Sequence, residues 1–501
     1  MNVQFGDYRL KRTERLLLGP RGPVDLSARS FDILATLLAK PDTVVGKAEL
    51  FDAVWPGLVV EENTLQVHIS ALRKALDDGM IMTVHGRGYK YAGPMPVAAL
   101  PGPSPAAGGT PTAARPSIAV LPFANMSDDP EQRYFSDGIT EDIITAVSRF
   151  PSLFVVAQAS SFAFREQELP VSELARQLGV AYILEGSVRK AGNRVRITAQ
   201  LIEAASGKHI WSEHYDRSLE DVFAVQDEVA RVIAWRLTAQ VEGDIVAHPS
   251  RQRPENFAAY DFMLRGMQLQ QRDTHDDTAA AIPLFERSIE LDPTFGEAHS
   301  WLAMCHIFYR TYDLDTAALA RASELARSGV RLDERNARCQ IAAGYCAMYS
   351  GQFDEAEFLH NRAALLNPNE AHVAMHVGAF HAYAGQPERS ESWFAIGRML
   401  NPFPPVWYRP FERIAHYGMG HYTDAAPASH GTWDNVLDLA YITASLGQMG
   451  RAEEAKASLT RCRELVPAGL SVRAYVEAEP YRLPASNAHL LDGLRKAGLT
   501  E

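Results

Sequence analysis

Residues 62–76 and 85–88 contain polar side chains whose types and spacing suit contacts with nucleic acid. The amide groups of Asn and Gln can pair with an adenine edge, a Val can touch a thymine methyl group, and Arg or Lys can bind guanine or phosphate. We therefore predict a nucleic acid-binding surface in this segment. Its candidate contact residues are Asn63, Gln66, Val67, Ser70, Arg73, Lys74, His85 and Arg87.

An amphipathic helix over residues 62–76 must hold the first six candidates on one face. Apolar side chains recur along this segment at intervals of four, three and four residues, so they form one helical stripe that we expect to be buried. These are Leu65, Ile69, Leu72 and Leu76. The polar candidates then face away from the core, and the Asp-Asp-Gly sequence at 77–79 ends the helix.

A basic hairpin is predicted directly after this helix. Residues 81–84 and 89–91 have the composition of strands, and His85-Gly86-Arg87-Gly88 between them permits a tight turn and a close approach of the backbone to another surface. A cationic hairpin tip beside a helix with a polar face is the layout of a winged helix. In that layout the tip points toward the minor groove.

The amino-terminal domain resembles a known DNA-binding family. The segments LSARSFDILATLL, VVGKAELFDAVW, VEENTLQVHISALRKAL and MTVHGRGYKYAG are similar to the winged-helix domain of OmpR/PhoB-type transcription factors. This resemblance covers residues 1–95. It implies that residues 62–76 lie in the major groove of double-stranded DNA and that the hairpin tip enters the minor groove. The sequence departs from the family at Ser70, Ala71 and His85, where arginine is common, so fewer cations are expected at the grooves.

The same resemblance implies a second contact surface. In some members of the family the loop between the second and third helices touches RNA polymerase, and the matching residues here are Trp55, Gly57 and Leu58. A loop with a purely structural role is the alternative.

Charge is unevenly distributed along the chain. Residues 1–95 contain 12 Lys and Arg against 11 Asp and Glu, a net charge of +1. Since the whole chain has a net charge of −12, the remaining residues have a net charge of −13. Because phosphate repels an acidic body, DNA must be contacted through the amino-terminal domain.

The chain shows no apolar run of membrane-spanning length and no signal-peptide core, so we expect a cytoplasmic protein without membrane contact. Its four cysteines lack metal-ligand spacing and are expected to be reduced core thiols.

Residues 96–116 predict a linker, because they are rich in proline, glycine and alanine and almost uncharged. Such a segment keeps two domains on the order of 25–70 Å apart.

Residues 117–242 predict an α/β domain that ends in an antiparallel meander. The segments IAVLPFANMSDD, YFSDGITEDI, LGVAYILEGSVRKAGNRVRITAQLI and GKHIWSEHYDR resemble the TolB-like amino-terminal module, which implies a binding or assembly role without settled catalysis. The domain contains two further candidate sites. Asp137, Glu141 and Asp142 are candidate catalytic carboxylates, with stabilisation of a helix amino terminus as the alternative. Arg189, Lys190, Arg194, Arg196 and Lys208 are a candidate anion-binding sheet face, with a solvent-exposed face as the alternative.

Residues 255–500 predict an array of paired helices with a 34-residue period. Pro368 and Pro402 lie 34 residues apart, and small residues recur between them at matching places, a pattern that is typical of the tetratricopeptide repeat. Such arrays bind extended peptides on the concave face of their first helices. Matching positions predict a groove of Arg338, Tyr345, Tyr349, His372, Met375 and Tyr383. This aromatic, mildly basic groove suits a protein or peptide partner or a small ligand, and self-association is an equal alternative.

The sequence therefore predicts a multidomain α+β protein with an amino-terminal winged helix-turn-helix, a central TolB-like α/β domain and a carboxy-terminal α-solenoid of tetratricopeptide repeats. The order of domains resembles regulators of the CadC and HilA type. It implies a sequence-specific, DNA-binding transcriptional regulator that is controlled through its carboxy-terminal region by a ligand, a partner or homo-oligomerisation on DNA. The alternative is a signalling scaffold whose winged helix binds protein.

No enzymatic activity is predicted from the sequence. The chain lacks a phosphate-binding Gly-Lys-Ser/Thr loop, a Gly-x-Ser-x-Gly elbow and a His-Glu-x-x-His helix. An enzyme related to cyclase-linked proteins would also need a cyclase part. His372 and His376 share a helix face, but no third ligand lies near them in sequence, so neither a metal nor another cofactor is predicted.

Overall fold

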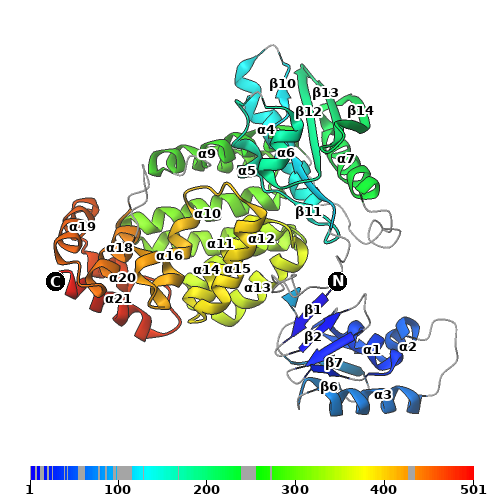
Figure 1. Cartoon of the computed structure of the whole chain (residues 1–501), viewed down its shortest axis with the longest axis horizontal. Helices are drawn as coiled ribbons and strands as arrows, with labels where there is room; N and C mark the ends of the chain where they lie inside the picture. The colour runs from blue at the N-terminus through cyan, green and yellow to red at the C-terminus, as the bar shows by residue number, and fades with distance from the viewer. Residues whose placement is uncertain are drawn as a thin grey trace. The chain divides into compact units, whose positions relative to one another are not determined.

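The structure, a computed structural model, describes residues 2–500 except for a set of short segments. These are residues 6–7, 12–15, 20–21, 25, 39, 42, 55–61, 77–78, 85–86, 94–96, 99–114, 128, 168, 238–255, 271–273 and 427–434. The chain divides into two units, Met1–Gly109 and Thr110–Glu501. The first is drawn in blue and the second from cyan to red in Figure 1.

The first unit has the elements of a winged helix. Its three helices are α1 (Ala28–Leu38), α2 (Lys47–Val54) and α3 (Glu62–Ala75). The amino-terminal strands are β1 (Asn2–Phe5), β2 (Tyr8–Lys11), β3 (Leu16–Gly19) and β4 (Gly22–Val24), and the carboxy-terminal sheet contains β5 (Val44–Gly46), β6 (Ile81–Val84) and β7 (Gly88–Tyr91). The predicted hairpin is β6 and β7, paired antiparallel from Ile81 with Tyr91 to Val84 with Gly88.

Two pairings in this unit were not predicted from the sequence. Strand β5 pairs with β7. Strand β8 (Val97–Ala98) pairs antiparallel with β1 and completes a sheet of order β4-β3-β2-β1-β8. Val97 and Ala98, which lie in the segment predicted to be a linker, therefore belong to the amino-terminal sheet.

The apolar stripe of α3 lies in the core of this unit, as predicted. Leu65, Ile69, Leu72 and Leu76 are each at most 6% exposed. They belong to one hydrophobic cluster with side chains of α1 and of the sheets, such as Leu34 and Tyr91. Burial of the stripe leaves the polar face of α3 toward solvent.

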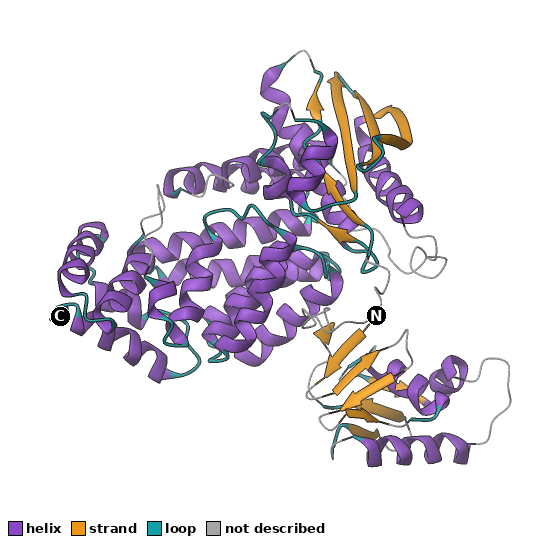
Figure 2. Ribbon diagram, viewed as in Figure 1, coloured by secondary structure: helices purple, strands orange, loops and turns teal. Residues whose placement is uncertain are grey.

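In the second unit, residues 115–237 form a sheet with helices on both faces (Figure 2). The strands are β9 (Ser117–Val120), β10 (Ala124–Asn125), β11 (Phe154–Val155), β12 (Tyr182–Ala191), β13 (Arg194–Glu203) and β14 (Lys208–Ser218). The helices are α4 (Arg133–Ser148), α5 (Gln158–Phe162), α6 (Val171–Leu178) and α7 (Val222–Leu237).

The strand order of this sheet is β11-β9-β12-β13-β14, with β10 paired to β12. Strands β11, β9 and β12 are parallel, and β12, β13 and β14 form the predicted antiparallel meander. Apolar side chains of α4 and α7 pack on one face of the sheet, and those of α6 pack on the other. We call residues 115–237 the α/β domain.

The rest of the second unit is an array of antiparallel helices. They are α8 (Phe257–Gln270), α9 (His275–Leu291), α10 (Gly296–Asp313), α11 (Thr316–Leu332), α12 (Ala337–Tyr349), α13 (Phe353–Leu366), α14 (Ala371–Tyr383), α15 (Pro387–Leu400), α16 (Tyr408–Gly418), α17 (Tyr422–Ala425), α18 (Val436–Gln448), α19 (Ala452–Leu465), α20 (Val472–Glu477) and α21 (Pro484–Lys496). The starts of α12 and α14, and those of α13 and α15, repeat the predicted 34-residue period. We call these helices the repeat array. None of the helices in the described part of the chain has the length and hydropathy needed to cross a membrane.

Polar contacts join the α/β domain to the repeat array. The side-chain amide of Asn369 donates to the backbone oxygens of Ser148, at 3.2 Å, and Phe150, at 2.9 Å. The Ser160 hydroxyl donates to Asn401 at 2.5 Å. These buried hydrogen bonds fix the end of α4 and the start of α5 against the loops that follow α13 and α15.

Candidate functional sites

The polar face of α3 carries most of the predicted nucleic acid contacts. Gln66, Val67, Ser70 and Lys74 are exposed. Val67 is 61% exposed, so its methyl groups are accessible to a binding partner. Arg87 is exposed between β6 and β7. Asn63 lies in the first turn of α3, where only the backbone is described, and His85 lies outside the described residues.

Arg73 has structural contacts of its own. Its side chain is exposed, but its Nε donates to the backbone oxygen of Ile81 at 2.9 Å and its guanidinium donates to the Thr83 hydroxyl at 2.7 Å. Arg73 therefore holds β6 against the last turn of α3. The predicted DNA contact by this residue stays a proposal.

His68, which was not predicted to have a role, and Gly88 position this surface. One ring nitrogen of His68 on α3 lies 3.0 Å from the Ser30 hydroxyl at the start of α1, and partial burial together with the nearby charge of Arg29 lowers the pKa of His68. Gly88 in the hairpin has a φ of 154°, and a Cβ there would lie 2.0 Å from the backbone oxygen of Val45. Only glycine fits this approach of β5 to β7, so the predicted close backbone contact is present.

The loop predicted to contact RNA polymerase, with Trp55, Gly57 and Leu58, lies outside the described residues.

A cavity of about 430 Å³ lies between the α/β domain and the repeat array. Helices α4 and α5 line one side, and α10, α12, α14, α16 and α18 line the other. The predicted groove residues that line it are Arg338, Tyr345, Tyr349, His372 and Tyr383. Met375 is instead fully buried. Its Sδ packs closely against Gly397 of α15, where an added Cβ would lie 2.5 Å from the sulfur. The prediction that Met375 faces the groove was wrong, because its place in α14 points between packed helices.

Arg338 is neutralised by carboxylates from several helices. Its guanidinium lies 2.5 Å from Glu141 of α4, 3.2 Å from Glu370 and 3.8 Å from Glu297. Burial opposes a charged guanidinium, but the charges of Glu141 and Glu370 outweigh it and raise the pKa of Arg338. The guanidinium also lies 5.4 Å from the ring centre of Trp301.

The expectation of a mildly basic groove was therefore wrong. Among the described residues that line the cavity, Arg338 is the one lysine or arginine, and the carboxylates are Glu141, Glu370, Asp438 and Glu479. Arg338 binds Glu141 and Glu370, whereas Asp438 binds the buried Arg413. Burial lowers the pKa of His372, and it lowers the pKa of His376 to about 4, so both imidazoles are neutral at physiological pH. The cavity is acidic because α4 contributes Glu141 and α14 is preceded by Glu370, neither of which belongs to the concave helix face.

Aromatic rings form much of the cavity wall. The ring of Trp407 lies 5.4 Å from His372 and 5.6 Å from Phe411, and Tyr345 and Tyr349 lie 5.3 Å apart. Toward α18, Glu479 accepts hydrogen bonds from the hydroxyls of Tyr383, at 2.8 Å, and Tyr441, at 3.1 Å. Such a wall suits a small ligand with an apolar or aromatic body and a cationic or hydrogen-bond-donating group.

The three candidate catalytic carboxylates take part in structural contacts. Asp137 binds Arg165 through two hydrogen bonds of 2.6 and 2.9 Å. Asp142 accepts hydrogen bonds from Tyr260 and Gln226, and Glu141 binds Arg338. These contacts tie α4 to Arg165 and to the helices that follow.

The candidate anion-binding face is largely paired. Arg194 and Arg196 both bind Asp216, and Lys190 lies 3.5 Å from Asp261. Arg189 donates to the backbone oxygen of Met126 at 2.9 Å. These acceptors reduce the positive charge that an anion would meet.

Comparison with known families supports the assignment of the first unit. Residues 21–91 match the family model described as transcriptional regulatory protein, C terminal. The amino-terminal domain is an OmpR/PhoB-type winged helix. Residues 113–232 match the model for the second domain of HilA/YgeH-like transcriptional regulators. The predicted fold class and the resemblance to OmpR/PhoB-type and HilA-type regulators are confirmed.

Three relatives show how the similarity is distributed. A Rhizobium meliloti protein described as putative adenylate cyclase 3 is 42% identical over 250 residues, 49% of this chain and 42% of that protein. The transcriptional regulator HilA of Salmonella typhimurium is 23% identical over 395 residues, 77% of this chain and 68% of its own length. PhoB, the phosphate regulon regulatory protein of Escherichia coli, is 32% identical over 95 residues, 18% of this chain and 42% of PhoB. The chain thus spans less than half of the first and third relatives.

Proposed function

We propose that this protein is a sequence-specific DNA-binding regulator of transcription. Helix α3 lies in the major groove, and the β6–β7 hairpin enters the minor groove. The observation that supports this most directly is the exposed face of Gln66, Val67, Ser70 and Lys74 above a buried leucine stripe, in a domain of the OmpR/PhoB type. A helix of this kind fits the width of the major groove.

Each side chain has a distinct part in the proposed complex. Gln66 and Asn63 pair with adenine edges, and Val67 covers a thymine methyl group. Lys74 and Arg87 neutralise phosphates on either side of the groove, and Arg73, Ser70 and His85 add further contacts. The loop around Trp55, Gly57 and Leu58 is proposed to touch RNA polymerase when the protein is bound.

Genome-wide footprinting of the tagged full-length protein tests this function. We expect discrete peaks that share a sequence motif, and we expect Gln66→Ala together with Val67→Ala to abolish them while the folded protein persists at its normal level. A chain that enriches no discrete sites, or a double variant with the same peaks, would instead support the scaffold alternative. Glu453→Ala on the exposed start of α19 is a matched surface control and should leave the peaks unchanged.

We further propose that a small ligand in the cavity controls the protein. The cavity walls come from both the α/β domain and the repeat array, so an occupant contacts both and stabilises their packing. The change is passed to the DNA through the oligomeric state, since two tethered winged helices on adjacent half-sites bind with a raised effective concentration. The matches to transcriptional-regulator families give no reason to propose cyclase activity.

Thermal unfolding with a panel of small aromatic amines and aromatic carboxylates tests the ligand proposal. We expect amines to raise the unfolding temperature, and we expect Trp407→Ala to remove the effect because Trp407 lines the cavity. A shift that persists in Trp407→Ala, or a panel without any shift, would contradict it. Comparing the full chain with residues 1–109, which include β8, on tandem half-sites tests the coupling, and equal apparent affinity would exclude it.

A further inference from the structure

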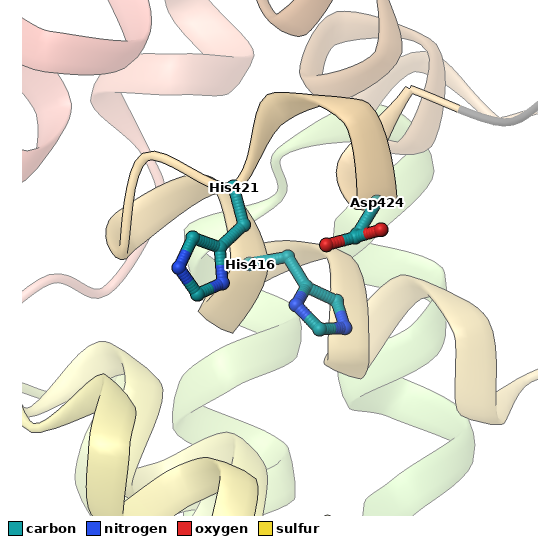
Figure 3. Close-up of side chains that lie close together, drawn as sticks. All are labelled: His416, His421 and Asp424. Atoms are coloured by element: carbon teal, nitrogen blue, oxygen red, sulfur yellow. The ribbon is translucent and has the colours of Figure 1, made fainter.

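The end of α16 and the start of α17 bring together two imidazole rings and a carboxylate, a cluster that was not predicted from the sequence. One potential ligand atom from each of His416, His421 and Asp424 lies within 4.8 Å of the other two. Figure 3 shows the three side chains near one another on this helical hairpin. The sequence signal was the spacing of five and then three residues across a glycine turn.

The backbone sets this arrangement. Gly420 has a φ of 76°, a conformation that reverses the chain after α16 and that side-chain-bearing residues rarely adopt. The backbone N–H of His421 then donates to the oxygen of His416 at 2.9 Å, and the N–H of Asp424 donates to the oxygen of His421 at 3.1 Å. The first contact brings His421 back beside α16, and the second places Asp424 one turn along α17.

Neighbouring contacts hold this hairpin in place. Ala425 is fully buried, and its backbone oxygen accepts a hydrogen bond of 2.8 Å from Arg413. The Tyr422 hydroxyl lies 2.8 Å from Nε2 of His489 in α21. The backbone of the cluster is therefore fixed, whereas the side chains of His421 and Asp424 are exposed and accessible to an ion.

The donor atoms suit a divalent transition metal. Imidazole nitrogens with one carboxylate are ligands of zinc and its neighbours, whereas magnesium and calcium prefer oxygen alone. Metal–ligand bonds of about 2.0–2.2 Å place the donors of a tetrahedral site about 3.4 Å apart, so small side-chain rotations close the cluster. Nδ1 of His416 is also buried, and it has no hydrogen-bond partner in the described part of the chain. A buried polar atom of this kind normally has a partner, and a bound ion is one way to supply it at this cluster.

We propose that His416, His421 and Asp424 bind a zinc-class divalent ion, with the remaining coordination positions open to solvent. The site is separate from the DNA-binding surface and does not depend on the proposed function. Helix α16 also contributes Phe411 and Ile414 to the cavity wall, so a bound ion would stiffen the far end of a helix that lines the cavity.

Titration of the metal-free full-length protein with Zn²⁺, in competition with a chromophoric zinc chelator, tests this site. We expect one ion to bind, and we expect His421→Gln and Asp424→Asn each to weaken binding at least about tenfold, since loss of even outer-shell partners has effects of about 10–100-fold. Both side chains are exposed, so circular dichroism and metal-free melting should match those of the unaltered protein.

His275→Gln is the matched control. His275 is an exposed histidine at the start of α9 whose ring nitrogen lies 3.4 Å from Asp276, and it belongs to no cluster of three potential ligands among the described residues. Its variant should bind zinc normally. Equal binding by the unaltered protein and by both cluster variants, or an equal loss in His275→Gln, would overturn the proposal.

Discussion

Arg73 illustrates how a single side chain can serve the fold and a binding surface together. It lies at the end of the polar face of α3, yet its guanidinium bonds to Ile81 and Thr83 on β6. Lys74 beside it is exposed on the same helix. Removal of Arg73 should therefore affect the stability of the domain, whereas removal of the neighbouring Lys74 should not.

We expect Lys74→Ala to weaken DNA binding without affecting the stability of the winged helix. Loss of one phosphate contact should lower the slope of log affinity against log salt by about 1. Arg73→Ala should in addition lower the free energy of unfolding by about 1 kcal/mol, because two hydrogen bonds to β6 are lost. Fluorescence anisotropy at several salt concentrations and urea unfolding measure the two effects. Equal stabilities of the two variants would contradict the structural role of Arg73.

Buried histidines make the repeat array sensitive to acid. Burial lowers the pKa of His360 to about 3. Its Nδ1 lies 2.7 Å from the backbone oxygen of Ala356, and its ring stacks on Phe380 with centres 4.9 Å apart. His381 is similar, because burial lowers its pKa to about 3 as well.

Acidification should therefore destabilise the array. The folded pKa of His360 lies below its ordinary value of 6.5, so the unfolded chain takes up a proton first as the pH falls. Stability that is complete above about pH 6.5 should decline toward pH 3 by up to about 1.4 kcal/mol per pH unit for each such histidine. Urea unfolding between about pH 7 and 5 should give a shallower decline for His360→Asn than for the unaltered protein. The exposed-site variant His275→Asn is the control, and identical slopes for all three proteins would contradict this account.

At the scale of elements, glycines set how closely paired helices pack. A Cβ on Gly378 of α14 would stand 2.4 Å from the Phe394 ring of α15, and one on Gly344 of α12 would stand 2.7 Å from the His360 ring of α13. These glycines are 34 residues apart and occupy equivalent places in successive helix pairs. The small residues that revealed the repeat in the sequence are thus the residues at the helix contacts.

Gly378→Ala should lower the free energy of unfolding by about 1–3 kcal/mol, since the added methyl group must displace a fully buried phenylalanine. Gly418→Ala at the end of α16 is the matched control, because its added Cβ would meet nothing closer than 3.7 Å. The control should stay within about 0.5 kcal/mol of the unaltered protein or gain helix stability. Denaturant unfolding monitored by circular dichroism compares the two, and equal losses would refute steric crowding at Gly378.

In the second unit as a whole, the α/β domain and the repeat array are joined by buried polar contacts, and a cavity lies between them. Arg338 is central to them, because it binds Glu141 of the α/β domain together with Glu297 and Glu370 of the array. Removing one partner of such a cluster leaves charges buried without compensation.

Arg338→Gln should destabilise the packing between these two parts by about 3–5 kcal/mol. Calorimetry should then show the α/β domain and the repeat array unfolding in separate transitions. Arg451→Gln, which removes an exposed partner of Glu454, is the control and should change stability by no more than about 1 kcal/mol. A single unshifted transition in Arg338→Gln would exclude this residue as the main link.

Much of the fold follows from local patterns in the sequence. The intervals of Leu65, Ile69 and Leu72 defined α3 and its buried stripe, and the glycines around Arg87 defined the hairpin. The 34-residue period defined α12 to α15. These features are predictable because helix and strand periodicity depend on residues a few positions apart. Strands β5 and β8 were not predicted. They consist of three and two residues, and each is stabilised by pairing with a strand that is distant in the sequence.

The amino-acid sequence was sufficient to predict the order of domains, the winged helix with its exposed polar face, and the 34-residue period of the repeat array. The charge of the cavity depends on the folded structure, because Arg338 and Glu141 are 197 residues apart in the chain and meet through the packing of two domains. Tertiary structure likewise decided that Arg73 supports β6 and that Met375 is buried. An ion pair or a burial depends on the direction of a side chain in the folded protein, and spacing along the chain specifies that direction only within one element.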